Sequence, residues 1–201
     1  ALARAVRLAV AEGELPDLLD LVEAHVEQHK TQRDLIDLYR EVCDQILDTR
    51  VQERVLLQIA KEAYAIGDRD VARDYYRRVL DNTNDHLTAL EALEKIYAEG
   101  RELESLLEIY SRRATLAQRE DRKDDGQRRQ YLILAGDLCE RELGRADEAI
   151  ALLEQVLQLF PSDPESANSL ERLYKNSLRW ADLADLLERR LKFASSDSET
   201  V

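Results

Sequence analysis

Apolar residues recur at intervals of three and four along most of the chain, which is the period of a helix packed on one side. No long stretch alternates apolar with polar residues, so the sequence predicts no strand. The pattern predicts eleven helices, at residues 1–12, 15–29, 31–48, 51–66, 69–82, 86–99, 102–121, 126–143, 145–160, 163–176 and 179–195. The chain is therefore expected to be all-α.

Residues that end or begin helices fall between these segments. The predicted stop signals are Gly13, Gly67, Gly100, Gly144 and the turn at 161–164. Glycine suits a helix end because it adopts the left-handed conformation without steric cost. Asp163 precedes Pro164 and is expected to cap the helix that begins there. The connections are short, so successive helices are expected to lie antiparallel.

The sequence repeats itself at a distance of 77 residues. Residues 67–80 align without a gap on residues 144–157, and residues 93–97 align on 170–174. Self-similarity at a fixed period is typical of stacked supersecondary units, in which neighbours bury the apolar face that one unit alone would expose.

Two segments resemble the tetratricopeptide repeat, a helix-turn-helix unit of about 34 residues. In the first segment the matching packing positions are Leu56, Ile59, Ala60, Ala63, Ala72, Tyr76 and Val79, with Gly67 at the turn. In the second they are Gly144, Ala149, Leu153, Val156 and Pro161. The resemblance implies a right-handed α-α superhelix, or solenoid, of about five helical hairpins.

The repeat pattern divides the chain into one partial and five complete units. The expected units are 1–12 (partial), 15–48, 53–85, 86–122, 126–162 and 163–195, within a single solenoid domain at 1–195. Residues 196–201 are expected to be a flexible tail. Units 53–85 and 126–162 match the family well, and the others match loosely, with a register that could shift by one residue. The Arg-rich, Lys-poor composition resembles that of long bacterial repeat proteins.

The charge balance limits the classes of partner. The formal net charge is -13, and phosphate backbones are bound through Lys and Arg, so nucleic acid is not an expected partner. An anionic membrane surface is disfavoured for the same reason, and no apolar run reaches the roughly 20 residues that span a bilayer. The negative field favours protein partners with basic patches. The chain begins at Ala1 and contains no Met, so we expect it to be part of a longer product.

No residue pattern predicts enzyme chemistry or a cofactor. Cys43 and Cys139 lie among apolar residues and are expected to be buried free thiols, which fits the reducing cytoplasm without establishing it. His25 and His29 share a helix face, but Val26 stands where the metalloprotease pattern needs Glu, so surface histidines are expected. The many carboxylates lie on helices, without the enclosure that a catalytic pair requires.

Two further features have alternative interpretations. Trp180 opens the last helix and is expected to pack against the preceding one, although Trp is also common at binding hot spots. Residues 112–129 are rich in Arg and Lys and are expected to form a solvated linker, with contact to an acidic partner or a neighbouring repeat as the alternative.

The resemblance implies a partner-binding groove lined by one face of each first helix. The predicted groove residues are Arg54, Leu57, Lys61, Tyr64, Leu90, Glu94, Tyr97, Glu171 and Tyr174. A tyrosine stripe down the groove would suit recognition, because Tyr offers a large contact area at small entropic cost. Packing of these tyrosines against adjacent helices stays open as the alternative. Leu57 and Leu90 stand where a clamp for a terminal carboxylate would need polar residues, so that function is not supported.

Together these observations predict a protein-protein interaction scaffold that binds a protein or peptide, with no cofactor, metal or catalytic residue. Two alternatives stay open. The chain could be the regulatory or recruiting arm of a larger multidomain enzyme. It could also be a structural solenoid that self-associates, because helix 1–12 lacks its expected hairpin partner and would expose a stacking face.

Overall fold

The computed structural model describes residues 2–29, 31–119 and 123–198. These residues form eleven α-helices and one short 3₁₀ turn, and they contain no strand. The predicted all-α fold is therefore confirmed. None of the described helices combines the length and the apolar character needed to cross a membrane.

The chain divides into two compact units, Ala1–Ile96 and Tyr97–Val201. The first contains α1 (Leu2–Glu12), α2 (Leu15–His29), α3 (Gln32–Val42), the 3₁₀ turn η1 (Cys43–Gln45), α4 (Thr49–Ala65), α5 (Arg69–Asn82) and most of α6 (Leu87–Gly100). The second contains the end of α6, α7 (Leu103–Leu116), α8 (Asp125–Arg141), α9 (Ala146–Leu159), α10 (Pro164–Asn176) and α11 (Trp180–Ser198).

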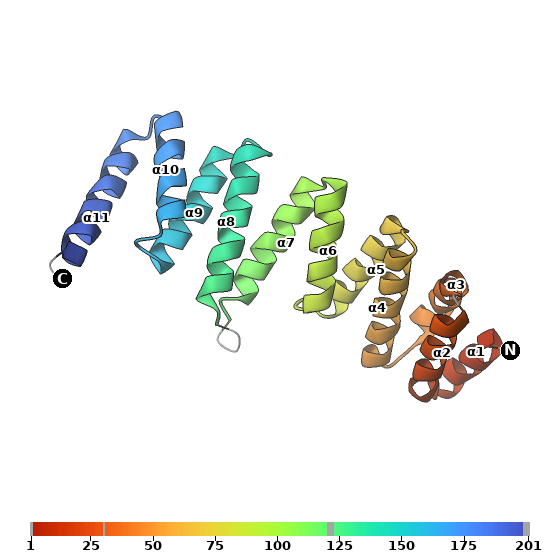
Figure 1. The fold of residues 1–201 in the computed structure, drawn as a ribbon. Helices are drawn as coiled ribbons and strands as arrows, with labels where there is room; N and C mark the ends of the chain where they lie inside the picture. The colour runs from red at the N-terminus through yellow and green to blue at the C-terminus, as the bar shows by residue number, and fades with distance from the viewer. Residues whose placement is uncertain (1, 30, 120–122, 199–201) are drawn as a thin grey trace. The chain divides into compact units, whose positions relative to one another are not determined.

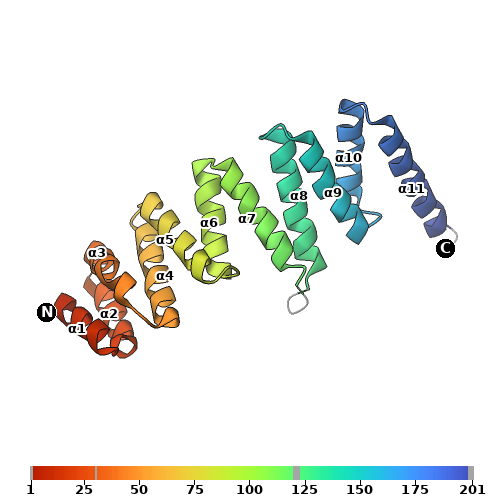
Figure 2. The same ribbon diagram turned by 180° about the vertical axis from the view of Figure 1, so that it is seen from behind.

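Small residues allow close helix packing in the first unit. Helix α4 packs against α5, and both views of the fold show the two side by side (Figure 1, Figure 2). Ala60 and Ala63 of α4 and Ala72 of α5 are fully buried, as the repeat pattern predicted. Because an alanine side chain is short, two helix backbones approach closely at these points, and larger side chains such as Ile59 and Val79 fill the space beside them.

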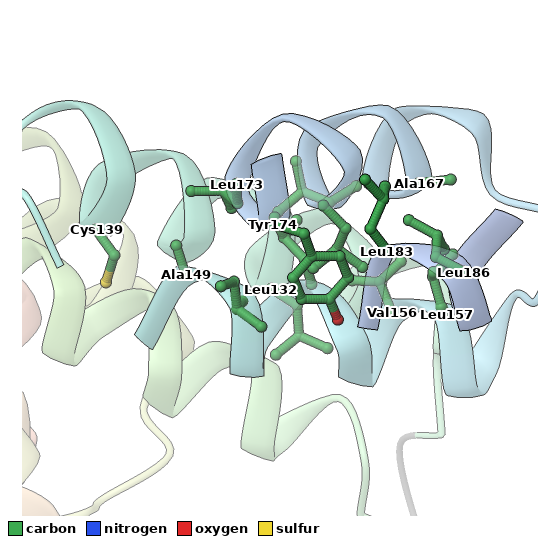
Figure 3. Packing of buried hydrophobic residues seen from close by; sticks show 14 of the residues in the cluster. Leu132, Cys139, Ala149, Val156, Leu157, Ala167, Leu173, Tyr174, Leu183 and Leu186 are labelled. Carbon is green, nitrogen blue, oxygen red and sulfur yellow. The ribbon is translucent and has the colours of Figure 1, made fainter. Parts of the chain in front are cut away.

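The core of the second unit lies between α8, α9, α10 and α11. Figure 3 shows Leu132, Val156, Leu173, Tyr174, Leu183 and Leu186 converging in this layer. Gly136 marks the closest approach of α8 to α9, since a Cβ atom added there would lie 3.2 Å from Cγ of Leu153. Gly136 thus takes the small-residue role in α8 that Ala60 takes in α4.

Aspartates cap several of the helices. Asp163 accepts a hydrogen bond from the backbone N–H of Ser166 at 2.9 Å, and Pro164 begins α10, which confirms the predicted cap. Asp48, Asp68 and Asp124 cap α4, α5 and α8 in the same way. Each carboxylate satisfies a backbone N–H of the first turn that has no partner within its helix.

Three helix ends differ from the sequence prediction by three residues or more. Helix α3 stops at Val42, not at residue 48, and the chain passes through η1 into an extended segment at Ile46–Asp48 that leads to the Asp48 cap. Helix α7 ends at Leu116, not at residue 121. Helix α11 continues to Ser198, so the tail predicted from residue 196 is helical as far as the structure describes it, because no Gly or Pro interrupts the last helix.

The residue that reverses the chain after α6 also differs from the prediction. Gly100 is still helical, and Arg101 takes the left-handed conformation with φ 54°. Leu178 does the same after α10, with φ 57°. In the first turn the backbone N–H of Glu102 donates to the carbonyl oxygen of Tyr97 at 2.9 Å. In the second turn the N–H of Arg179 donates to the carbonyl oxygen of Tyr174 at the same distance. The bonding pattern of the helix end therefore sets the conformation, although the residue carries a side chain.

Candidate partner-binding surfaces

The predicted groove residues of α4 share one accessible face. Arg54 and Lys61 are exposed, whereas Leu57 and Tyr64 are half-buried between them. The guanidinium of Arg54 donates to Asp20 and, at 3.1 Å, to Glu23, both on α2. These hydrogen bonds raise the pKa of Arg54, so it stays cationic. This face combines cationic, apolar and aromatic side chains.

Tyr64 is held in place by a neighbouring cation. The guanidinium carbon of Arg69 lies 3.9 Å from the centroid of the Tyr64 ring. Arg69 also donates to the backbone carbonyl oxygen of Tyr64 at 2.9 Å. The ring is therefore ordered before any partner arrives, which lowers the entropy lost on binding.

The groove residues predicted on α6 and α10 lie elsewhere. Leu90, Tyr97 and Tyr174 are buried in the core, so a partner has no access to them. The hydroxyl of Tyr174 donates to Glu154 at 2.5 Å. Only Glu94 and Glu171 are partly accessible. Tyr97 and Tyr174 therefore pack within the hairpins, as the alternative interpretation proposed, and do not extend Tyr64 into an accessible stripe.

The exposed positions of the loose units lie beside the predicted ones. On α6 Glu91 and Lys95 are exposed, and each lies one position after a predicted residue, Leu90 or Glu94. On α10 a shallow hollow of about 370 Å³ is lined by Asn168, Glu171, Arg172, Lys175 and Asn176. The sequence contains a signal for the burial of these residues. Leu90 and Tyr97 are seven residues apart, so both lie on the apolar helix stripe that packs inward.

Ion pairs about one repeat apart link neighbouring hairpins within each unit. They join residues 32 to 34 positions apart and comprise Arg7–Glu41, Arg54–Asp20, Arg78–Asp44, Arg129–Asp163 and Arg172–Glu140. Each exposed pair adds little stability by itself. The pairs nevertheless fix the side chains on the helix faces, and the sequence pattern did not reveal them.

The basic stretch at 112–129 is partly ordered by such contacts. Arg129 pairs with Asp163 and Glu165 of the next repeat, and Arg113 lies 4.5 Å from the centroid of the Tyr131 ring. These residues belong to hairpin packing, which is the alternative that the sequence left open. Residues 120–122 of this stretch lie outside the described residues.

Trp180 does not pack as predicted. Its side chain is 59% exposed at the start of α11. Leu187 and Leu191 lie on the same face of α11, because they follow Trp180 by seven and eleven residues, and they are 40% and 71% exposed. Leu183 and Leu186 occupy the buried face instead. Helix α11 therefore presents an apolar stripe on its outer face.

Burial raises the pKa of three titratable side chains in the core. Cys43 and Cys139 are buried free thiols, as predicted, and burial raises the pKa of both. Burial also raises the pKa of Tyr39, and the charge of Glu23 raises it further. His25 is exposed. Within the described residues, no group of three or more His, Cys, Asp or Glu side chains could hold a metal ion.

A comparison with protein families finds one match, inside the second unit. Residues 133–163 match the family model described as tetratricopeptide repeat. Residues 133–163 are a tetratricopeptide-repeat segment. The match spans the second half of α8, all of α9 and the connection to α10, and it overlaps the predicted unit 126–162. It confirms the resemblance that Gly144, Ala149 and Val156 suggested.

Solved structures with similar helix arrangements have low sequence identity. MamA 41-end from Desulfovibrio magneticus RS-1 is 14% identical, with 91% of this chain and 95% of that chain covered and a TM-score of 0.45. BtubC from P. vanneervenii is 17% identical, with coverages of 98% and 88% and a TM-score of 0.47. MamA AMB-1 is 15% identical, with coverages of 85% and 93% and a TM-score of 0.47. No curated protein matches the sequence.

Proposed function

We propose that the chain is a protein-protein interaction scaffold that binds a protein or peptide on the exposed face of its first helices. The observation that carries the proposal is the α4 face, where Arg54, Leu57, Lys61 and Tyr64 remain accessible together. Arg and Tyr are enriched among residues that dominate binding energy at interfaces. The tetratricopeptide repeat at 133–163 supports the same role, since repeats of this kind present one helix face to a partner.

The charge distribution favours a partner that carries both signs. The whole chain has a net charge of -13, which attracts a basic protein from a distance. On the α4 face Lys61 is an exposed cation that suits an acidic side chain at the point of contact, whereas Arg54 is already paired with Asp20 and Glu23. We therefore propose a partner with basic patches around an acidic or aromatic contact segment.

The test changes the α4 face without disturbing the core. A Lys61→Glu and Tyr64→Ala double variant reverses one exposed charge and removes the half-buried ring. The matched control is Arg77→Glu with Tyr75→Ala on α5, where Arg77 is exposed and Tyr75 half-buried. Far-UV circular dichroism and thermal melting establish that both variants fold.

Partners are captured by crosslinking from the source cells, identified by mass spectrometry and then purified. We expect the dissociation constant of a captured partner to rise at least about ten-fold for the α4 double variant, a loss of about 1.4 kcal/mol. The α5 control should bind as the unmodified chain does. Equal binding by both variants would refute the assignment of the α4 face.

A second candidate function, self-association, is supported by the apolar stripe of α11. Burying Trp180, Leu187 and Leu191 against a second copy would remove exposed apolar surface from water. Sedimentation velocity over a wide concentration range should then show a dimer, and Leu191→Glu should return it to a monomer. A chain that stays monomeric at every concentration contradicts this second function.

A further inference from the structure

A groove of about 580 Å³ lies in the first unit, between the turn that joins α1 to α2 and the extended segment that leads into α4. Its size falls within the range of about 300–1,000 Å³ that is typical of ligand pockets. The apolar part of its lining comprises Val10, Leu15, Pro16, Ile46, Leu47 and Val51. None of the four residues of the α4 face described above lines this groove, so each surface can be tested with its own variants.

Leu47 is the unusual residue of this groove. Its side chain is 98% exposed, although it lines an apolar surface. Ile46 and Asp48, on either side, have extended backbone conformations. Between the described residues, no backbone hydrogen bond outside the helices engages Leu47. Helix packing therefore does not account for an apolar side chain at this position.

The polar side chains of the groove are predominantly acidic. Glu12 and Asp48 line it together with the amide of Gln45, and no Lys or Arg does so. The carboxylate of Asp48 is fixed in place, because it accepts hydrogen bonds from the backbone N–H groups of Arg50 at 2.8 Å and Val51 at 3.1 Å. An anionic ligand would meet two carboxylates, whereas a cationic ligand would find charge complementarity.

We propose that this groove binds an extended peptide segment of a partner protein, in which a bulky apolar side chain is flanked by Lys or Arg. The apolar side chain enters between Pro16, Ile46 and Val51, and Leu47 closes over it. The flanking cations pair with Glu12 and Asp48. An extended backbone is expected because the segment at Leu47 is itself extended and carries main-chain groups that a second chain can reach.

The probe is a fluorescein-labelled synthetic peptide with a central Phe and two Lys on each side, and binding is followed by fluorescence anisotropy. Two comparison peptides replace the central Phe by Gly or the four Lys by Glu. We expect saturable binding of the first peptide and at least about ten-fold weaker binding of both others. No saturable binding of the Phe–Lys peptide, or equal binding of the Glu peptide, would overturn the proposal.

Two variants of the chain separate the apolar and electrostatic parts of the site. Leu47→Ser removes the apolar wall, and it should leave folding intact because that side chain is almost fully exposed. Glu12→Gln with Asp48→Asn removes both charges, while the Asn oxygen can still cap α4. Each is expected to weaken peptide binding at least about ten-fold. Leu178→Ser changes another exposed leucine, in the second unit, and should bind as the unmodified chain does.

The variants also decide between a peptide and a second copy of the chain as the occupant. Sedimentation velocity without peptide should show the same mass for the unmodified chain and for Leu47→Ser. A dimer that Leu47→Ser dissociates would mean that a second copy fills the groove, and the peptide proposal would fall. Peptide binding that is unchanged in Leu47→Ser and in the double charge variant would overturn it equally.

Discussion

Replacing Asp163 should reveal how much stability one buried ion pair adds to a helix cap. Asp163 is only 7% exposed, and its two oxygens serve different partners. Oδ2 accepts a hydrogen bond from the backbone N–H of Ser166 at 2.9 Å, and Oδ1 accepts one from Nε of Arg129 at 2.6 Å. Arg129 also donates to Glu165 at 2.9 Å, so it keeps one partner if Asp163 is removed.

The two contributions can be separated by the choice of substitution. Loss of an N-cap costs about 1 kcal/mol of unfolding free energy. A hydrogen bond to a charged group contributes about 1.5–3 kcal/mol, reduced here because Arg129 is 30% exposed and keeps Glu165. We expect Asp163→Ala to cost about 2–3 kcal/mol. Asp163→Asn keeps the cap and should cost about 1–2 kcal/mol.

The effect should also depend on pH. Burial alone would raise the pKa of Asp163, but the hydrogen bonds from Ser166 and Arg129 outweigh it, so the pKa lies below its usual value. The ionised carboxylate therefore stabilises the fold above about pH 4, and this stabilisation is lost as the pH falls through the folded-state pKa. The difference between Asp163 and Asp163→Asn should shrink in the same range.

Urea unfolding measures these differences, with far-UV circular dichroism for the helices. Fluorescence of Trp180, the one tryptophan of the sequence, adds a probe on the helix that follows α10. Asp124→Ala is the control, because Asp124 caps α8 from an exposed position and should cost about 1 kcal/mol. The reasoning fails if Asp163→Ala is no more destabilising than Asp124→Ala, or if Asp163→Asn is as stable as the unmodified chain.

Three further predictions concern the turns, the helix crossings and the thiols. Gly144→Ala should lower the unfolding free energy by about 1 kcal/mol, because φ is 67°; the loss is limited to this backbone strain, since an added Cβ would meet no other atom. Leu178→Gly, where φ is 57°, should leave the unfolding free energy unchanged or raise it by up to about 1 kcal/mol. Ala72→Leu should cost about 1–3 kcal/mol by overpacking the crossing of α4 and α5. Cys43 and Cys139 should react with a thiol reagent only as fast as the chain opens, because both side chains are fully buried and burial also raises the pKa of both thiols.

Each of these predictions has a result that contradicts it. Urea unfolding would show Gly144→Ala at unchanged stability if the turn tolerated a side chain. Ala65→Leu, at an exposed position of α4, is the control for Ala72→Leu and should be neutral. For the thiols, labelling at the rate of a free cysteine in the absence of urea would mean that they are accessible in the folded chain.

The secondary structure and much of the core could be predicted because they depend on local sequence. The helical period placed all eleven helices, and alanines such as Ala60, Ala72 and Ala149 are buried at the helix crossings as the repeat pattern indicated. The Asp163 cap was predictable because donor and acceptor lie within four residues of each other. Such interactions need no knowledge of the rest of the fold.

The candidate binding surfaces were predicted only in part. The α4 face followed from a well-matched repeat, so Arg54, Lys61 and Tyr64 are accessible. On α6 and α10 a shift of one residue rotates a side chain by about 100° around the helix, and this separates the buried Leu90 from the exposed Glu91. A loosely matched repeat does not fix the register to one residue, so Tyr97 and Tyr174 were misplaced.

An acidic, all-α chain with a tetratricopeptide repeat at 133–163 follows from local sequence, because helix period, caps and turns act over a few residues. Only the tertiary structure showed that Trp180 is exposed, that Arg129 pairs with Asp163, and that Leu47 lines an acidic groove. The physical reason is distance along the chain. The ion pair and the groove involve residues roughly one repeat apart, and the exposed side chains have no neighbour to cover them. A local sequence pattern does not predict which distant helix packs against a given residue.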